Sequence, residues 1–259
     1  LQKRIVSGEV RLSFDSRFGY LPSVLEQLKV PASSQVLVYS KTSLQVKYIS
    51  PRSPRAIYFN DDAYVGWVKG GNLEVSAVDP QLGANFYLLE QQAADKPRFQ
   101  RQTYECLQCH GSALTRDVPG HMVRSVHTEP DGHQLITAGS FLTDHTSPFK
   151  ERWGGWYVTG EHGAQRHLGN LIVRRSDDLK NLNLEAGANA RDLRPWMESS
   201  AALTGHSDIV ALMVLEHQAN LHNRITRASF LARGLLLEEQ QANRESGRPL
   251  DQLSAETEL

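Results

Sequence analysis

The sequence predicts an α+β fold with a β-rich N-terminal half, a loop-rich middle and a long C-terminal helix. Short runs of β-branched and aromatic residues, separated by turn sequences, fill the first hundred residues. Two tryptophans, five glycines and two histidines crowd 152–170, and apolar residues recur at helical spacing after Ser207. We expect a single α+β domain over 1–259, with a β-rich portion 1–97, a central portion 98–243 and a frayed polar tail 244–259.

The N-terminal elements are predicted from local patterns. A short helix is expected over 21–30, where apolar residues fall on one helical face before Pro31. The runs QVLVYS, LQVKYIS, AIYFN, AYVGWV and LEVSAV predict five strands of a mixed or antiparallel sheet, at 35–40, 44–50, 56–60, 63–68 and 73–78.

Downstream, 95–111 is compatible with a short helix that ends near Gly111, and 121–144 predicts a hairpin around Pro130-Asp131-Gly132. A long helix should follow, with Ser207 as its N-cap. We expect its inward face to carry the stripe Val210, Met213, Val214, His217, Leu221 and Ile225.

Charge and hydropathy exclude some classes of partner. The chain carries 28 Lys+Arg against 29 Asp+Glu and a net charge of -1, so it offers no basic field for nucleic acid. No apolar run approaches the roughly 20 residues that cross a bilayer. The chain starts at Leu1 without a methionine, so we expect that a preceding segment has been removed. A secretion signal or a membrane anchor would lie in that segment.

One short motif holds both cysteines of the chain. In YECLQCHG, residues 104–111, Cys106 and Cys109 are separated by two residues and His110 follows directly. Covalent haem attachment uses this arrangement, because two thiols one helical turn apart match the porphyrin vinyl groups and the next imidazole reaches the iron. A structural zinc site needs four ligands, and a redox dithiol needs a βαβ context and gives the histidine no role.

The motif therefore predicts one covalently bound haem c, with Cys106 and Cys109 as the thioether anchors and His110 as the proximal iron ligand. Attachment of this kind takes place outside the cytoplasm, so we expect a periplasmic or otherwise extracytoplasmic protein. A total of two cysteines agrees, since no thiol is left free to oxidise.

Further segments strengthen this interpretation by resemblance. SPRAIYFNDDAYVGWV, VDPQLGANFY, CLQCHG, VPGHMVRSV, TDHTSP, ERWGGWYVTGEHG and LEHQ resemble segments of bacterial proteins that contain a cytochrome c domain, and the resemblance covers most of the chain. It implies haem attachment and an extracytoplasmic compartment, without a specific reaction. The β-rich segment before the motif indicates a larger α+β body than the small all-helical cytochrome c fold.

The sixth iron position decides between an electron carrier and an enzyme. His217 is the first candidate for a distal ligand, and His145 in a loop is the second. His162, also in a loop, and Met213 on the long helix are further candidates. As catalytic groups of a distal pocket we consider His217, Glu216 and His145, although Glu216 also fits a solvated helix residue.

Several other residues have both a structural and a functional interpretation. Trp153, Trp156 and Tyr157 fit core packing or haem contact. Three arginines, Arg124, Arg152 and Arg166, fit the surface or propionate binding. The segment 60–62 predicts a turn, with a calcium site as the alternative.

Three functions follow from these expectations. The first is a monohaem c-type cytochrome that transfers single electrons between redox partner proteins. The second is a haem oxidoreductase whose distal pocket acts on peroxide, oxygen or a nitrogen oxide. The third is a haem-anchored sensor or a subunit of a redox complex.

Overall fold

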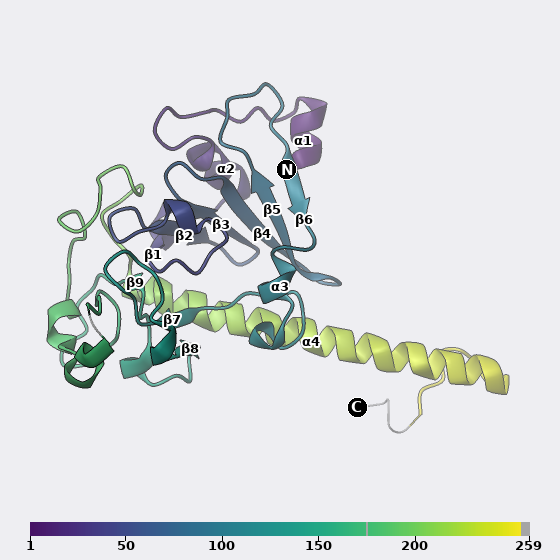
Figure 1. Ribbon diagram of the computed structural model, residues 1–259. Helices are drawn as coiled ribbons and strands as arrows, with labels where there is room; N and C mark the ends of the chain where they lie inside the picture. Colours follow the sequence, from purple (N-terminus) through teal and green to yellow (C-terminus); the bar gives the residue numbers. More distant parts are fainter. Residues whose placement is uncertain (175, 255–259) are drawn as a thin grey trace.

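The computed structural model describes residues 1–174 and 176–254 (Figure 1). It confirms the α+β class: an antiparallel sheet occupies the N-terminal half, a loop-rich middle follows, and the long helix α4 (Ile209–Ser246) comes last. Two short helices, α1 (Gln2–Ser7) and α2 (Leu21–Leu28), precede the sheet, and α3 (Leu107–His110) follows it. The predicted helix over 21–30 is therefore present.

The main sheet has seven strands in the order β6-β5-β4-β3-β2-β1-β9, and every neighbouring pair is antiparallel. Its strands are β1 (Val36–Val38), β2 (Arg55–Phe59), β3 (Ala63–Trp67), β4 (Leu73–Asp79), β5 (Gly83–Leu89), β6 (Phe99–Gln102) and β9 (Trp156–Tyr157). A second sheet pairs β7 (Arg124–Val126) with β8 (Ser140–Leu142).

Both faces of the main sheet are covered. One core contains Leu21, Leu25 and Tyr58, where α2 packs on the sheet. The other contains Trp153 and Leu212, from the loop-rich middle and from the first turns of α4. Strand β3 is buried along its whole length, because it receives side chains on both faces.

The loop-rich middle returns to the sheet through β9. Ser207 is buried beside it, where its hydroxyl accepts a hydrogen bond from Leu37 N–H at 2.9 Å and donates one to Tyr157 O at 2.5 Å. Ser207 therefore ties two strands together instead of capping α4. Asp208 is the N-cap, since its carboxylate accepts from Ala211 N–H at 2.9 Å.

Several local predictions need correction. The expected strand at 44–50 contains the 3-10 turn Val46–Tyr48 instead. Strands β5 and β6 were not predicted, because β5 begins with small residues and β6 is polar and half-exposed. Segment 60–62 is a turn, in which Asn60 Oδ1 accepts from Asp62 N–H and Ala63 N–H at 3.0 and 2.8 Å. The hairpin over 121–144 is confirmed, with its turn closed by Gly132 N–H to Glu129 O at 2.9 Å.

The largest difference concerns α4. Its buried residues are Ile209, Leu212, Leu215, Glu216, Ala219, Asn223, Thr226 and Asn243, whereas the stripe predicted to face inward is exposed. The helix also continues through Ser246 into the predicted frayed tail, and Asn243 Nδ2 donates to Gln252 O at 2.6 Å. The rest of that tail, 255–259, lies outside the described residues. No helix in the described part is apolar over a length that would cross a membrane.

Candidate functional site

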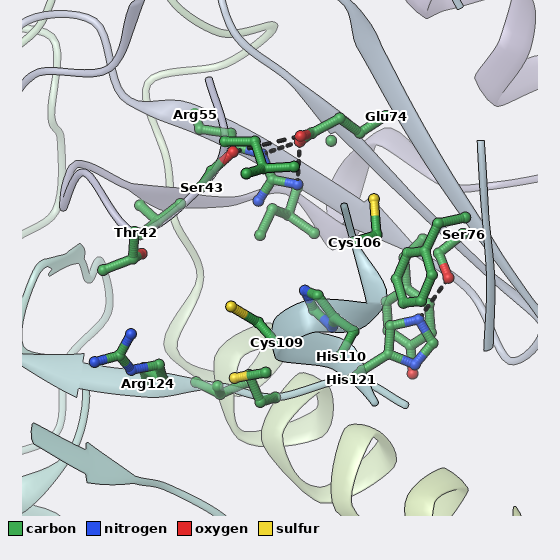
Figure 2. Close-up of a pocket in the computed structure, with 18 of the residues that line it drawn as sticks. Thr42, Ser43, Arg55, Glu74, Ser76, Cys106, Cys109, His110, His121 and Arg124 are labelled. Atoms are coloured by element: carbon green, nitrogen blue, oxygen red, sulfur yellow. Dashed lines mark hydrogen bonds and ion pairs between the residues drawn. The ribbon is translucent and has the colours of Figure 1, made fainter. Parts of the chain in front are cut away.

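The cysteine motif forms one turn at the edge of the main sheet. Cys106 is the N-cap of α3, and its carbonyl accepts from His110 N–H at 2.9 Å. Both cysteines are free thiols, Cys106 half-buried and Cys109 exposed. This turn places the two thiols and the His110 imidazole in the wall of one cavity (Figure 2).

The cavity has a volume of about 470 Å³, which lies within the range of small-molecule and cofactor pockets, about 300–1,000 Å³. Its walls come from the sheet, from the segment 121–124 and from the inner face of α4. Most of its lining is apolar, including Val38, Ile57, Val75, Phe86, Leu114, Val123, Trp156 and Leu215.

His110 is held in one orientation. Its Nδ1–H donates to Gly120 O at 2.8 Å, and the Phe86 ring packs 4.8 Å from its centroid. Burial lowers the pKa of His110, while the hydrogen bond to Gly120 acts in the opposite direction. Because Nδ1 carries the proton in this hydrogen bond, Nε2 of the neutral ring is unprotonated. Its lone pair is therefore available to a metal ion.

Helix α4 supports the carbonyl that orients His110. Asn223 on α4 accepts from His121 N–H at 2.9 Å and donates to His121 O at 2.7 Å. A Cβ on Gly120 would lie 2.1 Å from Asn223 Oδ1, so only glycine allows this close approach. The contact between α4 and residues 120–121 therefore fixes the position of the Gly120 carbonyl that accepts the hydrogen bond from His110.

An ion pair lines the same cavity. Arg55 on β2 and Glu74 on β4 are about four-fifths buried, and Nε and Nη2 of Arg55 both lie 2.5 Å from Glu74 Oε2. They lie across the cavity from His110 in Figure 2. Gly66, on the intervening strand β3, leaves the space for this pair, since its Cβ would lie 2.3 Å from Arg55 Nη2.

The Cys106 thiol is in a non-activating environment. Burial raises the pKa of Cys106, and the carboxylates of Glu74 and Glu105 raise it further. A redox dithiol depends on a lowered thiol pKa, so this environment does not favour the dithiol alternative.

The predicted distal ligands lie elsewhere. Nδ1 of His217 and Nδ1 of His145 lie 3.0 Å apart in an exposed pair. His162 donates from Nδ1 to Gln165 O at 2.8 Å and accepts at Nε2 from Asn189 N–H at 2.9 Å, and Met213 is exposed on the outer side of α4. None of these four side chains lines the cavity that contains His110.

Glu216 is not the solvated helix residue considered from the sequence. Its side chain is fully buried, and Oε1 accepts a hydrogen bond from Arg152 Nη1. Burial raises the pKa of Glu216 to about 7, against the lowering effect of the Arg152 guanidinium. Glu216 lines a second cavity of about 270 Å³, and the two cavities have five lining residues in common: Leu114, His121, Met122, Val123 and Ala219.

Of the other candidates from the sequence, some line the first cavity and the rest lie elsewhere in the fold. Arg124 lines the first cavity, whereas Arg152 pairs with Glu216 and Arg166 pairs with Glu185 at the surface. Trp156 lines the cavity, and its Nε1–H donates to Arg124 O at 2.7 Å. Trp153 and Tyr157 are buried in the two cores on either side of the sheet.

Sequence reasoning missed Arg55, Glu74, His121 and Met122, which also line the cavity. His121 is buried, its Nε2 lies 2.7 Å from Ser76 Oγ, and its Nδ1 has no hydrogen-bond partner within the described residues. Arg55 and Glu74 could have been noticed in the sequence, because each is a charged residue next to or within an otherwise apolar predicted strand. The strand register that brings them together cannot be read from the sequence.

Comparisons with known proteins give no relative: no family model, no curated protein and no solved structure matches this chain. Within 1–174 and 176–254, no group of three or more His, Cys, Asp or Glu side chains is arranged to hold a metal ion.

Proposed function

We propose that the cavity holds one haem, attached through Cys106 and Cys109 and ligated by His110. The observation that carries this proposal is that both thiols and the imidazole of one Cys-x-x-Cys-His turn line a single cavity, with His110 Nδ1 bound to Gly120 O. A ligating histidine commonly has its second nitrogen fixed in this way, which sets its tautomer and orientation.

The lining of the cavity fits this group. Haem iron takes its equatorial nitrogens from the porphyrin, so the protein has to supply axial ligands only. The apolar walls suit the macrocycle, and Arg124, whose Nη2 donates to Gln134 Oε1 at 3.2 Å, offers a cation for a propionate.

The function that this site supports best is single-electron transfer between extracytoplasmic redox partners, by a monohaem c-type cytochrome. Bound haem supplies a reversible one-electron centre. His110 would donate Nε2 to the iron, Gly120 O would keep the ring oriented, and the apolar walls would exclude water. Cys109 is exposed, so the motif lies where a partner protein can approach it.

The Arg55–Glu74 pair favours a second function, a haem oxidoreductase acting on peroxide, oxygen or a nitrogen oxide. Such chemistry needs a hydrogen-bond donor and an acid/base group near the open iron position. Arg55 and Glu74 line the cavity and come from the sheet, whereas His110 comes from α3.

Redox titration with and without carbon monoxide tests the two functions. A carrier should titrate as one electron per chain and bind carbon monoxide slowly or not at all, because its sixth position is filled. Rapid carbon monoxide binding to the ferrous protein would favour the oxidoreductase. A protein that takes up no electron in this titration would contradict both.

A further inference from the structure

A second cavity lies beside the one that contains His110. It has a volume of about 270 Å³. Its wall is built from residues of four segments, 113–116, 121–123, 142–144 and 216–223, the last on the inner face of α4. Five of its lining residues, among them His121 and Ala219, also line the first cavity. The two cavities are therefore neighbours that share part of their walls.

The second cavity reaches from the surface to a buried carboxyl group. Leu114 and Leu142 in its wall are 40% and 46% exposed, whereas the Glu216 side chain is fully buried. Asn220 and Asn223 add polar groups to the wall. A polar cavity of this size has room for several water molecules, so it can bring solvent to Glu216.

Two buried polar atoms of this wall have no hydrogen bond of normal geometry within the described residues. They are Oε2 of Glu216, whose other oxygen accepts from Arg152 Nη1, and Nδ1 of His121. Buried polar atoms are nearly always paired, and ordered water is the usual partner where the protein supplies none. These two atoms therefore indicate that water occupies the second cavity.

Glu216 lies close to the first cavity without lining it. Its neighbours on α4, Leu215 and Ala219, both line the first cavity. His121 is in the shared wall, and its Nε2 lies 2.7 Å from the hydroxyl of Ser76, another residue of the first cavity (Figure 2). A charge that appears in the first cavity thus acts on Glu216 through protein, where charges are screened much less than in bulk water.

The surroundings of Glu216 allow it to gain or lose a proton near neutral pH. Burial raises the pKa of Glu216 to about 7, while Arg152, Thr143 and Trp153 act to lower it. A new negative charge nearby raises the pKa of a carboxyl group further. Reduction of a centre in the first cavity would therefore favour the protonated form of Glu216.

The other charged or titratable groups near Glu216 are less suited to this exchange. Burial acts to raise the pKa of Asp144, but hydrogen bonds from the following loop lower it below its usual value. Burial lowers the pKa of His121 well below its usual range, so this ring stays neutral. Arg116 contributes a positive charge to the wall, and the His145–His217 pair lies at the surface.

We propose that Glu216 takes up a proton from solvent, through the second cavity, when a redox centre in the first cavity accepts an electron. The proposal rests on the proposed function. The electron comes from a redox partner protein, which is oxidised by one electron, and the proton passes from water in the second cavity to the carboxylate of Glu216. Oxidation of the centre returns the electron to the next partner and the proton to solvent. The charge that each electron adds is thus compensated beside the site.

Redox titration of the holoprotein at a series of pH values tests this coupling. The midpoint potential should fall as the pH rises from 6 to 8, because reduction takes up a proton. The reduction equilibrium should change at least twofold per pH unit, about 18 mV for one electron. Glu216→Gln keeps the shape of the side chain but cannot ionise, so it should lose this dependence. Glu185→Gln is the control, since Glu185 is exposed and lines neither cavity.

Infrared difference spectra of the wild-type protein, reduced minus oxidised, test the same step without a variant. The C=O band of a protonated carboxyl group should appear on reduction near pH 7 and should shift in D2O, because the second cavity admits solvent. Absence of the band, a band that persists in Glu216→Gln, or a wild-type pH slope that persists in this variant would overturn the proposal.

Failure of this proposal can be told from failure of the proposed function. A chain that keeps its haem through acid–acetone extraction but has a midpoint potential independent of pH overturns the role of Glu216 alone. A chain from which intact haem is released overturns the proposed function, and the proton uptake with it.

Discussion

Arg55 and Glu74 form an ion pair across β3, with Nε and Nη2 of Arg55 each 2.5 Å from Glu74 Oε2, in the wall of the cavity that also contains His110. Ser43 Oγ lies 3.4 Å from the other carboxylate oxygen. Two charges that are only one-fifth exposed need a reason to be retained, because burial of ions costs free energy even when they are paired.

Replacement of Arg55 should weaken anion binding at the iron. If the pair serves the open position of a haem, Arg55→Leu removes a charge-assisted donor and should lower the affinity of the ferric protein for fluoride by about tenfold or more. Optical titration measures this affinity. Arg166→Leu is the control, since Arg166 pairs with Glu185 at the surface and does not line the cavity. Equal fluoride affinities in wild type and Arg55→Leu would show that Arg55 does not take part in anion binding at the iron.

Gly66 offers an independent route to the same result. A Cβ at Gly66 would lie 2.3 Å from Arg55 Nη2, so Gly66→Ala should displace the guanidinium from Glu74. The cost to stability should be about 1 kcal/mol, because a flexible side chain can move. Thermal unfolding and fluoride titration together check this. An alanine variant with full fluoride affinity would contradict the role of the pair.

Substitution of the surface histidines should leave the iron environment unchanged. His145 and His217 face each other, with Nδ1 atoms 3.0 Å apart, away from the cavity. We expect His217→Ala and His145→Ala to keep the ferric absorption spectrum and to change stability by less than about 1 kcal/mol. Conversion of either variant to a high-spin spectrum would restore that histidine as the distal ligand.

Glu216 should make stability depend on pH. Burial raises its pKa from 4.5 to about 7, so between these values the folded protein holds a proton that the unfolded chain releases. This contribution to stability is complete below pH 4.5 and is lost as the pH rises through about 7, at no more than about 1.4 kcal/mol per pH unit.

Urea unfolding at a series of pH values should show this slope in the wild type and lose it in Glu216→Gln. Glu185→Gln is the control, because Glu185 is exposed and Arg166 lowers its pKa. If Glu216→Gln keeps the same pH dependence of the free energy of unfolding, that dependence arises from another titratable group.

The sequence predicted those features that depend on local patterns. The strands over 56–60, 63–68 and 73–78 have strong β-branched and aromatic runs, and they occur where expected. The three site residues Cys106, Cys109 and His110 are adjacent in one motif, so the fold was not needed to bring them together.

Features that depend on long-range packing were not predicted. The face of α4 that packs inward combines apolar residues such as Leu212 and Leu215 with Asn223, which makes two hydrogen bonds to His121, whereas the apolar periodicity used for the prediction favoured the opposite face. Arg55 and Glu74 are 19 residues apart in sequence and meet only because Gly66 leaves a gap between them. Neither relationship follows from the residues taken one segment at a time.

The central claim is that Cys106 and Cys109 carry a covalent haem, and denaturing acid–acetone extraction tests it most directly. The full chain is produced in cells that mature c-type cytochromes, extracted, and separated by size with detection at the Soret band. Thioether bonds predict that the haem absorbance stays with the polypeptide, and that it is lost from a Cys106→Ala, Cys109→Ala variant. Release of intact haem from the wild-type chain, or a colourless wild-type protein, would contradict the account.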